Sequence, residues 1–265
     1  MSLEALTCAL RSLAPLELAE PWDNVGWLLP GREGRGLARA LLTIDLTDAV
    51  LDEAAELQVD AIVAYHPVMF EGKKRLRREV ASERVVLRAI EAGLPVFSPH
   101  TALDAAPGGL TDWLADAIGF GDRSPIVRSA LHAGAGQGRV TALAQPASLE
   151  SIVPRVKAHL GITSLRVACA ARHGAGARIE TAAVVAGAGG SVLAKASADL
   201  WLTGELRHHD VLAAVEAGTT VLLAEHTGTE RGYLPILAER LRDVAASGFE
   251  VLVSERDRDP VSPAS

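Results

Sequence analysis

The chain has 265 residues, of which 49% are apolar, and a formal net charge of −7 at pH 7. This charge argues against nucleic acid as the main partner, because binding to phosphates needs a basic face. The sequence contains no unbroken apolar run of about 18 residues, so it predicts no membrane-spanning helix. The N-terminus carries polar and acidic residues too early for a signal peptide. These features predict a cytoplasmic protein that does not act in a membrane.

Two cysteines are the only thiols of the chain. Cys8 and Cys169 lie far apart, with neither a CxxC pattern nor a histidine at ligand spacing. This arrangement predicts two buried thiols in a reducing compartment, and it offers no thiolate ligands for a soft metal.

Strand-like and helix-like segments alternate in the first half of the chain. Strands are predicted at residues 40–45, 60–65 and 94–97, and helices at 47–57, 79–92 and 109–118. Thr47 is the expected N-cap of the first helix, and Gly93 is expected to close the second. Successive β–α units predict an α/β fold with a sheet that is largely parallel.

The second half begins after residues 122–138, a segment with Gly, Ser and Pro and little periodicity that we interpret as a linker. Strands are then predicted at 140–144, 165–170, 181–186, 199–202, 220–224 and 249–253, and helices at 149–160, 191–197, 207–217 and 229–246. The chain is therefore divided into an N-terminal α/β lobe (1–121), the linker, a C-terminal α/β lobe (139–253) and a flexible tail (254–265).

Three predicted strands end on a histidine, namely His66, His100 and His226. The last two begin a His-Thr-x-x-acid pattern that ends on Asp104 and on Glu230. A histidine and an acid at this spacing share a side of the chain if a helical turn starts between them, and a threonine suits the cap of such a turn.

Ligands bind at the carboxyl ends of strands in open α/β sheets. Imidazole and carboxylate groups suit divalent ions such as Zn, Fe, Mn or Ni, and the pattern does not choose among these four. The predicted metal ligands are His66, His100, Asp104, His226 and Glu230.

The two halves of the chain resemble each other in outline. The strands at 60–63 and 199–202 are each followed by a helix that ends in Ala-Gly, and then by the strand that carries His-Thr-x-x-acid. Internal duplication and chance similarity of α/β units both explain this likeness. A duplication would bring the two motifs to one cleft between the lobes.

Three further segments each allow two interpretations. Glu205 and His209 follow the strand at 199–202 and form either a polar helix start or a second shell with a proton shuttle. Residues 187–191 form either a tight turn or a weak phosphate cradle. The basic run at 73–78 forms either a solvated loop or a small anion-binding patch.

Several motifs together resemble the Nif-three-like family, whose members are often labelled GTP cyclohydrolase 1 type 2 homologues. The matching segments are Pro21-Trp22-Asp23-Asn24-Val25-Gly26, Tyr65-His66-Pro67, the two His-Thr motifs, Thr203-Gly204-Glu205 and His209-Asp210. The resemblance covers about residues 21–241. It implies two similar, intertwined α/β lobes with a dinuclear metal site in the cleft, and a homo-oligomer that forms a hexameric ring.

By position in these motifs, His66, Asp104, His226 and Glu230 match metal ligands, and His100 matches a site histidine. One residue departs from the pattern, because many members have a histidine where this chain has Tyr65. The absence of this imidazole would weaken one metal position, unless Tyr65 itself ligates the ion or acts as a second-shell group. One ion and two ions per chain both remain open.

The leading hypothesis is a metal-dependent, hydrolase-like protein with a small-molecule substrate, such as a nucleotide or a phosphate ester. The alternative is a non-catalytic metal-binding protein with a regulatory or scaffold role. An open coordination position would favour an enzyme, whereas a fully protein-filled site would favour the alternative. GTP cyclohydrolase activity itself does not follow, because the sequence shows neither a zinc–thiolate site nor a clear triphosphate-binding cluster.

Overall fold

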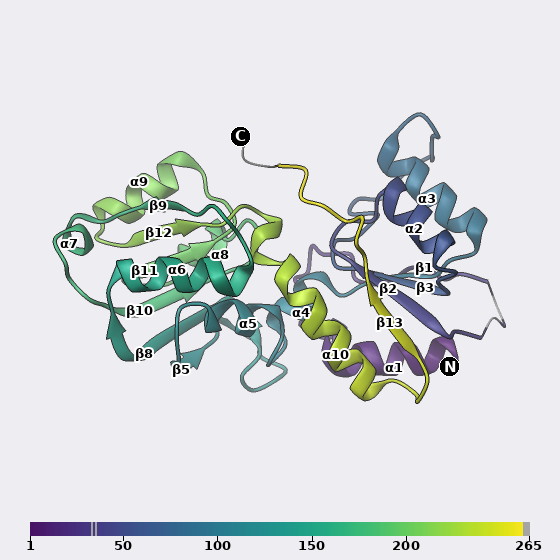
Figure 1. Ribbon diagram of the computed structural model, residues 1–265, viewed down its shortest axis with the longest axis horizontal. Helices are drawn as coiled ribbons and strands as arrows, with labels where there is room; N and C mark the ends of the chain where they lie inside the picture. Colours follow the sequence, from purple (N-terminus) through teal and green to yellow (C-terminus); the bar gives the residue numbers. More distant parts are fainter. Residues whose placement is uncertain (33, 35, 262–265) are drawn as a thin grey trace. The chain divides into compact units, whose positions relative to one another are not determined.

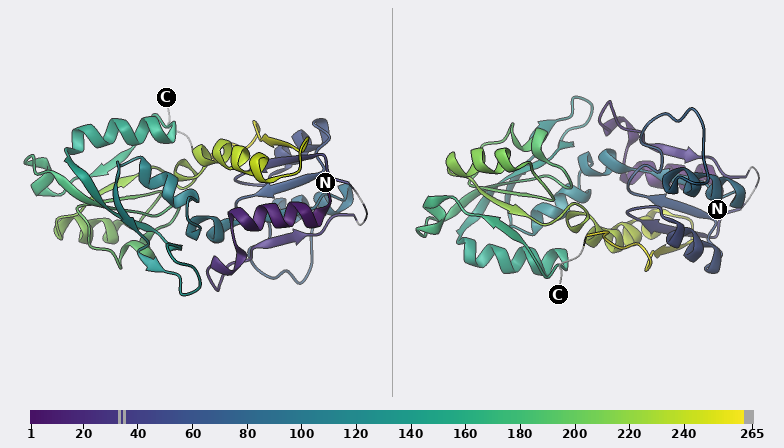
Figure 2. Two further views of the ribbon diagram at one scale, coloured as in Figure 1. Left: turned by 90° about the horizontal axis from the view of Figure 1, so that it is seen from below. Right: turned by 90° about the horizontal axis from the view of Figure 1, so that it is seen from above.

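Residues 1–32, 34 and 36–261 are described by the computed structural model, and they form two compact α/β units (Figure 1; Figure 2). Unit 1 combines Met1–Leu103 with Leu234–Pro260, and unit 2 is built from Asp104–Tyr233. The α/β class predicted from the sequence is confirmed. In the described part of the chain, no helix is both long and apolar enough to cross a membrane.

Unit 1 contains a five-stranded sheet in the order β1-β4-β3-β2-β13. The strands are β1 (Gly26–Leu29), β2 (Arg39–Thr43), β3 (Ala61–Ala64), β4 (Val96–Ser98) and β13 (Glu250–Val253). The last four run parallel to one another, whereas β1 pairs antiparallel with β4. Parallel strands are covered on both faces, and β3 is accordingly buried along its whole length.

Helices cover both faces of this sheet (Figure 1). On one face, α2 (Asp48–Glu56) and α3 (Ala81–Ala92) bury residues such as Val50 and Val86 against Leu41 and Ile62 of the sheet. A second pair, α1 (Leu3–Leu13) and α10 (Leu234–Val244), packs together, and α10 contacts β2 and β13.

The helix boundaries follow local sequence signals. The Thr47 hydroxyl accepts a hydrogen bond of 3.3 Å from the Val50 N–H at the start of α2. Gly93 has a φ of +66° and closes α3 in the left-handed conformation that glycine adopts at little cost. Both predictions are confirmed.

Unit 2 contains a six-stranded sheet in the order β5-β8-β10-β11-β12-β9. The strands are β5 (Gly121–Ser124), β8 (Arg139–Ala147), β9 (Arg166–Ala168), β10 (Ile179–Val184), β11 (Leu200–Thr203) and β12 (Thr220–Leu223). Only the central strands β10, β11 and β12 run parallel, and the other neighbours pair antiparallel. A small hairpin of β6 (Val127–Arg128) and β7 (Gly136–Gln137) lies outside this sheet.

Helices of unit 2 pack on its sheet as well. Helix α5 (Leu110–Asp116) contacts β8 and β10, and α9 (His208–Glu216) contacts β12. The remaining helices are α4 (His100–Ala105), in which the division between the units falls, and α6 (Leu149–Leu160), α7 (Ala171–Gly174) and α8 (Gly190–Leu193).

The two sheets share part of their topology, as the outline of the sequence suggested. In each unit a parallel strand–helix–strand run, β3-α3-β4 or β11-α9-β12, ends on the strand that carries a His-Thr motif. That last strand also pairs antiparallel with a short strand, β1 or β9. The equivalent βαβ runs place both motifs at the carboxyl end of a parallel strand.

Several details differ from the sequence-based expectations. Helix α1 and strand β1 were not predicted. The last helix begins at Leu234 rather than at residue 229, because residues 227–233 form two 3-10 segments, Thr227–Thr229 and Arg231–Tyr233. Cys8 and Cys169 are exposed, so the prediction of buried thiols is wrong: Cys8 lies on the outer side of α1, and Cys169 follows the edge strand β9.

The lobe boundaries at residues 121 and 139 stay a prediction. The compact units of the structure instead divide at residues 103–104 and 233–234, because α10 and β13 pack on the sheet of unit 1. The segment interpreted as a linker holds most of β5 and the hairpin β6–β7. Within the proposed tail, the Ile44 N–H donates to Asp257 and the Glu255 N–H to Glu53, whereas residues 262–265 lie outside the described residues.

Part of the basic run at 73–78 is structural. Arg77 donates from Nε and Nη2 to the two carboxylate oxygens of Glu83, at 2.8 and 2.7 Å, and lowers the pKa of Glu83 from 4.5 to about 2. A lowered carboxyl pKa stabilises the folded state above the unfolded pKa, and this stabilisation is lost as the pH falls toward the folded pKa.

We therefore expect Glu83→Gln to lower the melting temperature at pH 7 and to flatten its dependence on pH between 4.5 and 2. Thermal unfolding followed by circular dichroism across that range measures the effect. Equal slopes for the variant and the unchanged chain would contradict it.

Candidate metal centre

The first candidate ligand of unit 1 stands at the carboxyl end of β3. The strand continues its pairing beyond Ala64, because the His66 N–H donates to the Ile44 carbonyl at 3.0 Å. Asp45 follows the neighbouring parallel strand β2, so both side chains emerge at the same edge of the sheet. There the His66 Nδ1 lies 2.9 Å from the Asp45 Oδ1.

The second candidate, His100, follows β4 on the other side of β3. Its Nδ1 lies 2.8 Å from the Oδ1 of Asp23, whose side chain is fully buried, and the other carboxylate oxygen of Asp23 accepts from the N–H and the hydroxyl of Thr101. Burial opposes ionisation of Asp23, but the hydrogen bonds from His100 and Thr101 outweigh burial and lower its pKa. Asp23 is therefore an anion near neutral pH.

Tyr65 lies between these two histidines. Its side chain is buried, and its ring centroid lies 5.0 Å from that of His66 and 5.4 Å from that of His100. The two imidazole centroids are 5.5 Å apart. Tyr65 thus contacts both candidate ligands of unit 1, which is the position expected of a second-shell group.

Two exposed aromatic side chains flank His100. Trp22 and Phe70 are 57% and 50% exposed, and their ring centroids lie 5.7 Å from each other and 6.2 and 6.1 Å from that of His100. The Asn24 side chain donates to the Met69 carbonyl at 2.6 Å and ties their two loops together. These contacts hold an apolar surface beside a candidate ligand.

A helical turn does begin at His100, as the His-x-x-x-acid spacing required. Helix α4 spans His100–Ala105, and Asp104 lies in its last turn. Thr101 does not cap this turn, however, because its hydroxyl donates to Asp23 and accepts from the Glu20 N–H. The structure therefore assigns Thr101 to the support of Asp23 rather than to capping.

The candidate ligands of unit 2 follow β12. A 3-10 turn over Thr227–Thr229 brings His226 and Glu230 together, with 3.6 Å between the His226 Nε2 and the Glu230 Oε1. The other ring nitrogen of His226 lies 3.1 Å from Glu205 Oε1. Glu230 is 1% exposed. A nearly buried carboxylate beside an imidazole nitrogen is a donor pair that can bind a metal ion.

Two glycines leave room for this pair. A Cβ built on Gly187 would lie 2.9 Å from the His226 Nε2 and 3.0 Å from the Glu230 Oε1, and its φ is +57°. A Cβ on Gly204 would lie 2.7 Å from the His226 Cα. The N–H groups of Gly204 and Glu205 both donate to the Gly187 carbonyl. The loop interpreted as a tight turn or a phosphate cradle thus forms one wall around the ligand atoms.

Backbone strain accompanies both His-Thr motifs. His100 has a φ of +27°, and Glu225, just before His226, has a φ of +62°. Positive φ values are costly for residues other than glycine, and they concentrate at functional sites. In both units the chain is strained where it turns from the strand into the motif.

The three candidate histidines share one arrangement. In each of them Nδ1 faces a carboxylate: Asp45 for His66, Asp23 for His100 and Glu205 for His226. Since a carboxylate only accepts, the neutral tautomer that satisfies each pair has its proton on Nδ1 and its lone pair on Nε2. This carboxylate–histidine pairing is the second shell typical of metal-bound histidines.

The sequence-based reasoning found one of these carboxylates and missed two. Glu205 was named as a second-shell candidate, whereas Asp23 and Asp45 were not. His209, the other second-shell candidate, lies in the first turn of α9, where its ring contacts that of His208. Asp45 ends a predicted strand, so the rule that selected the histidines would also have selected it.

Comparisons with known proteins identify the family of the chain. The family model described as Duf34/NIF3 (NGG1p interacting factor 3) matches residues 1–260. The protein NIF3 homolog of Schizosaccharomyces pombe is 40% identical to the chain over 269 residues, with 96% of the chain and 95% of the relative covered.

Among solved structures, the Bacillus cereus protein related to NIF3 has a TM-score of 0.85 at 17% identity. The match covers 98% of this chain and 98% of that protein. Reduced HcgD from Methanocaldococcus jannaschii has a TM-score of 0.81 at 23% identity, covering 96% of the chain and 98% of HcgD. These structures show the same fold. The match along residues 1–260 shows that the chain belongs to the Duf34/NIF3 family.

Proposed function

We propose that the chain is a metal-dependent, hydrolase-like protein in which His66, His100, Asp104, His226 and Glu230 hold one or two divalent ions. The observation that carries this proposal is the carboxylate on Nδ1 of all three histidines. Such a partner fixes the tautomer and the orientation of a ligand imidazole. Three separate instances, each at the end of a parallel strand, favour metal binding over three incidental surface histidines.

The donor set fits a hard or borderline divalent ion. It contains imidazole nitrogens and carboxylate oxygens and no thiolate, which suits Zn, Fe, Mn or Ni. The close approach of Gly187 to His226 and Glu230 also fits, because any side chain there would fill the space around the donors. A divalent ion supplies Lewis acidity, which activates water and polarises a phosphoryl or carbonyl group.

The protein's own residues have distinct tasks in this proposal. Asp23 and Asp45 orient the histidines of unit 1, and Glu205 orients His226. Glu230 provides a negative charge that is almost wholly buried, and a buried carboxylate is stabilised by a cation beside it. Glu205 is half exposed, so it can also exchange a proton with solvent.

A nucleotide or a phosphate ester is the substrate class that the surroundings of His100 favour. Trp22 and Phe70 offer exposed ring faces on which a planar base can stack. Phe70 also lines a pocket of about 290 Å³ together with Lys73, whose ammonium group suits a phosphate. These features support a ligand that combines a ring with an anionic group.

Hydrolysis assays on the metal-reconstituted chain test this function. We expect p-nitrophenyl phosphate or a nucleoside monophosphate to be hydrolysed, and the rate to fall at least tenfold after chelation or in the Glu230→Gln variant. Equal rates before and after chelation would refute a metal-dependent hydrolase. Bound metal without hydrolysis of any tested substrate would favour the non-catalytic alternative.

Tyr65 decides between one and two ions in this proposal. We expect Tyr65→His to raise the metal content from about one toward two ions per chain, because an imidazole would replace a phenol that contacts both His66 and His100. Elemental analysis by mass spectrometry measures the ratio, with Tyr233→His as a control at another buried tyrosine. An unchanged ratio would contradict a role of residue 65 in occupancy.

We also propose a homo-oligomer, with the hexameric ring implied by the family resemblance, in the cytoplasm. Family membership supports this assembly. Light scattering coupled to size-exclusion chromatography tests it: six times the chain mass of 27.7 kDa is expected. The mass of a monomer would contradict it.

A further inference from the structure

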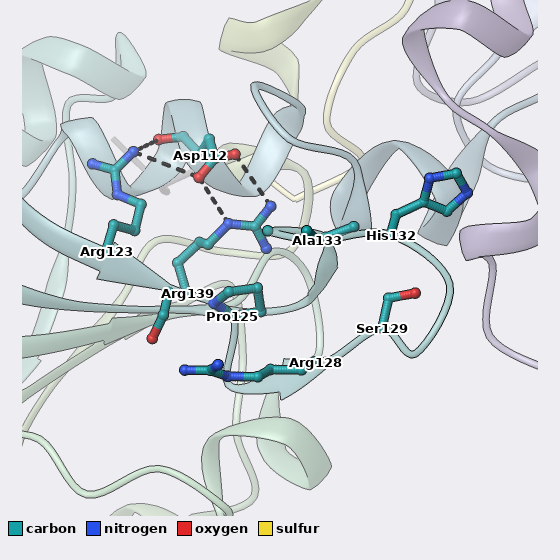
Figure 3. A pocket seen from close by; sticks show the side chains of 11 residues that line it. Asp112, Arg123, Pro125, Arg128, Ser129, His132, Ala133 and Arg139 are labelled. Carbon is teal, nitrogen blue, oxygen red and sulfur yellow. Dashed lines mark hydrogen bonds and ion pairs between the residues drawn. The ribbon is translucent and has the colours of Figure 1, made fainter.

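A pocket in unit 2 lies apart from the residues assigned to metal binding. It is bounded by α5, β5 and the hairpin β6–β7 (Figure 3), and its volume is about 380 Å³. This volume falls within the range of pockets for small molecules. The side chains that matter for the argument are Asp112, Arg123, Arg128, Ser129 and Arg139.

The lining carries more positive than negative charge. It contains three arginines and one carboxylate, although the whole chain has 33 acidic and 26 basic residues. A cationic pocket on an acidic protein concentrates anions from solution. The charge of the lining therefore selects for a negatively charged ligand.

Arg139 fixes the floor of the pocket. It is 1% exposed, and its Nε and Nη2 donate to the two oxygens of Asp112 at 2.7 and 3.1 Å. Its Nη1 donates to the carbonyls of Gly136 and Gly138, which belong to β7 and the residue after it. Arg139 is thus neutralised and fully bonded, and it positions the pocket wall rather than contacting a ligand.

The other two arginines are less satisfied. Arg123 donates to Asp116 and to the Asp112 carbonyl at 2.7 and 2.9 Å, but its Nε is buried without a hydrogen-bond partner. Arg128 is exposed, and in the described part of the chain its guanidinium forms no hydrogen bond or ion pair. Arg128 therefore contributes a positive charge that no carboxylate offsets.

The loop that completes the pocket is held in shape by its own hydrogen bonds. The Ser129 N–H donates to the Ala135 carbonyl at 2.9 Å, and the Leu131 N–H donates to the Ser129 hydroxyl oxygen at 3.1 Å. Since that oxygen accepts, the hydroxyl proton remains to be donated. The loop is thus ordered by its own hydrogen bonds and needs no ligand to hold its shape, and the Ser129 hydroxyl points away from the Arg128 guanidinium (Figure 3).

We propose that this pocket binds a small molecule through a phosphate group, with Arg128 as the main cation. A guanidinium matches the oxygens of a phosphate in a two-pronged contact, which makes arginine the preferred partner for this anion. The proposal is independent of the metal centre, because none of the proposed metal ligands lines the pocket.

Calorimetric titration of the full-length, chelator-treated chain with inorganic phosphate and with glycerol 2-phosphate, at constant ionic strength, tests the proposal. We expect both anions to bind, and Arg128→Ser to weaken binding about tenfold, as for the loss of a charge-assisted hydrogen bond. Arg258→Ser, which removes an exposed arginine from unit 1, is the matched control and should leave binding unchanged.

Three results would overturn the inference: no binding to the unchanged chain, equal binding by Arg128→Ser, or binding that appears only after divalent metal is added. The last result would assign the phosphate to the metal centre instead. Since the titration uses chelator-treated protein, a failure of this proposal leaves the metal proposal untouched, and the reverse also holds.

Discussion

Replacing Gly187 by alanine is expected to lower the metal content of the purified chain at least tenfold. The new Cβ would lie 2.9 Å from the His226 Nε2 and 3.0 Å from the Glu230 Oε1, which is too close for either atom to keep its place. Alanine at a φ of +57° also adds strain of about 1 kcal/mol. Elemental analysis measures the metal, and thermal unfolding measures the strain.

Gly161→Ala separates these two effects. Gly161 also lies in unit 2 and has a φ of +68°, but a Cβ there meets no atom within 4 Å. This control carries the strain without the obstruction, so it should lower the melting temperature and leave the metal content intact. If both variants kept their metal, Gly187 would not shape a metal site.

Glu230→Gln is expected to lower the metal content severalfold while the chain stays folded. The substitution keeps the shape of a side chain that is 1% exposed, and it removes the negative charge that a divalent ion requires of its ligand. Elemental analysis gives the metal content, and circular dichroism verifies the fold.

Glu225→Gln provides the control for this variant. Glu225 lies on the same connection, but its side chain is 42% exposed and pairs with Arg166 at 3.0 Å. The Glu225→Gln variant should therefore keep the metal content of the unchanged chain. Unchanged metal stoichiometry in Glu230→Gln would refute the assignment of Glu230 as a ligand.

The sequence predicted best what depends on neighbouring residues. Each apolar strand and the histidine at its end are adjacent in the chain, so the carboxyl end of the strand places the histidine without further information. The structure finds His66, His100 and His226 at such ends, and the helical turn after His100 follows from the spacing of its motif.

Contacts between distant residues were harder to predict. Asp45 and His66 are 21 residues apart and meet because β2 and β3 are parallel neighbours, which a strand order would have revealed. Asp23 and His100 are 77 residues apart, and Asp23 precedes a strand that pairs antiparallel at the sheet edge. No period or spacing links them, so only the family motif gave a signal for Asp23.

The packing of α10 shows the same limit. Its apolar residues, such as Leu237 and Leu241, predict a buried face but not the sheet that covers it. In the structure α10 contacts β13 and β2 of unit 1, although the elements before it belong to unit 2. No local sequence pattern indicates that the chain returns to an earlier unit.

The most direct test of the proposed centre is the metal content of the purified chain and of two variants, His66→Ala and His226→Ala, measured by elemental mass spectrometry. His66 belongs to unit 1 and His226 to unit 2, so the two variants test the proposed ligands of each unit separately. We expect one or two divalent ions per chain, with a severalfold loss in both variants. Full metal content in either variant would contradict the account.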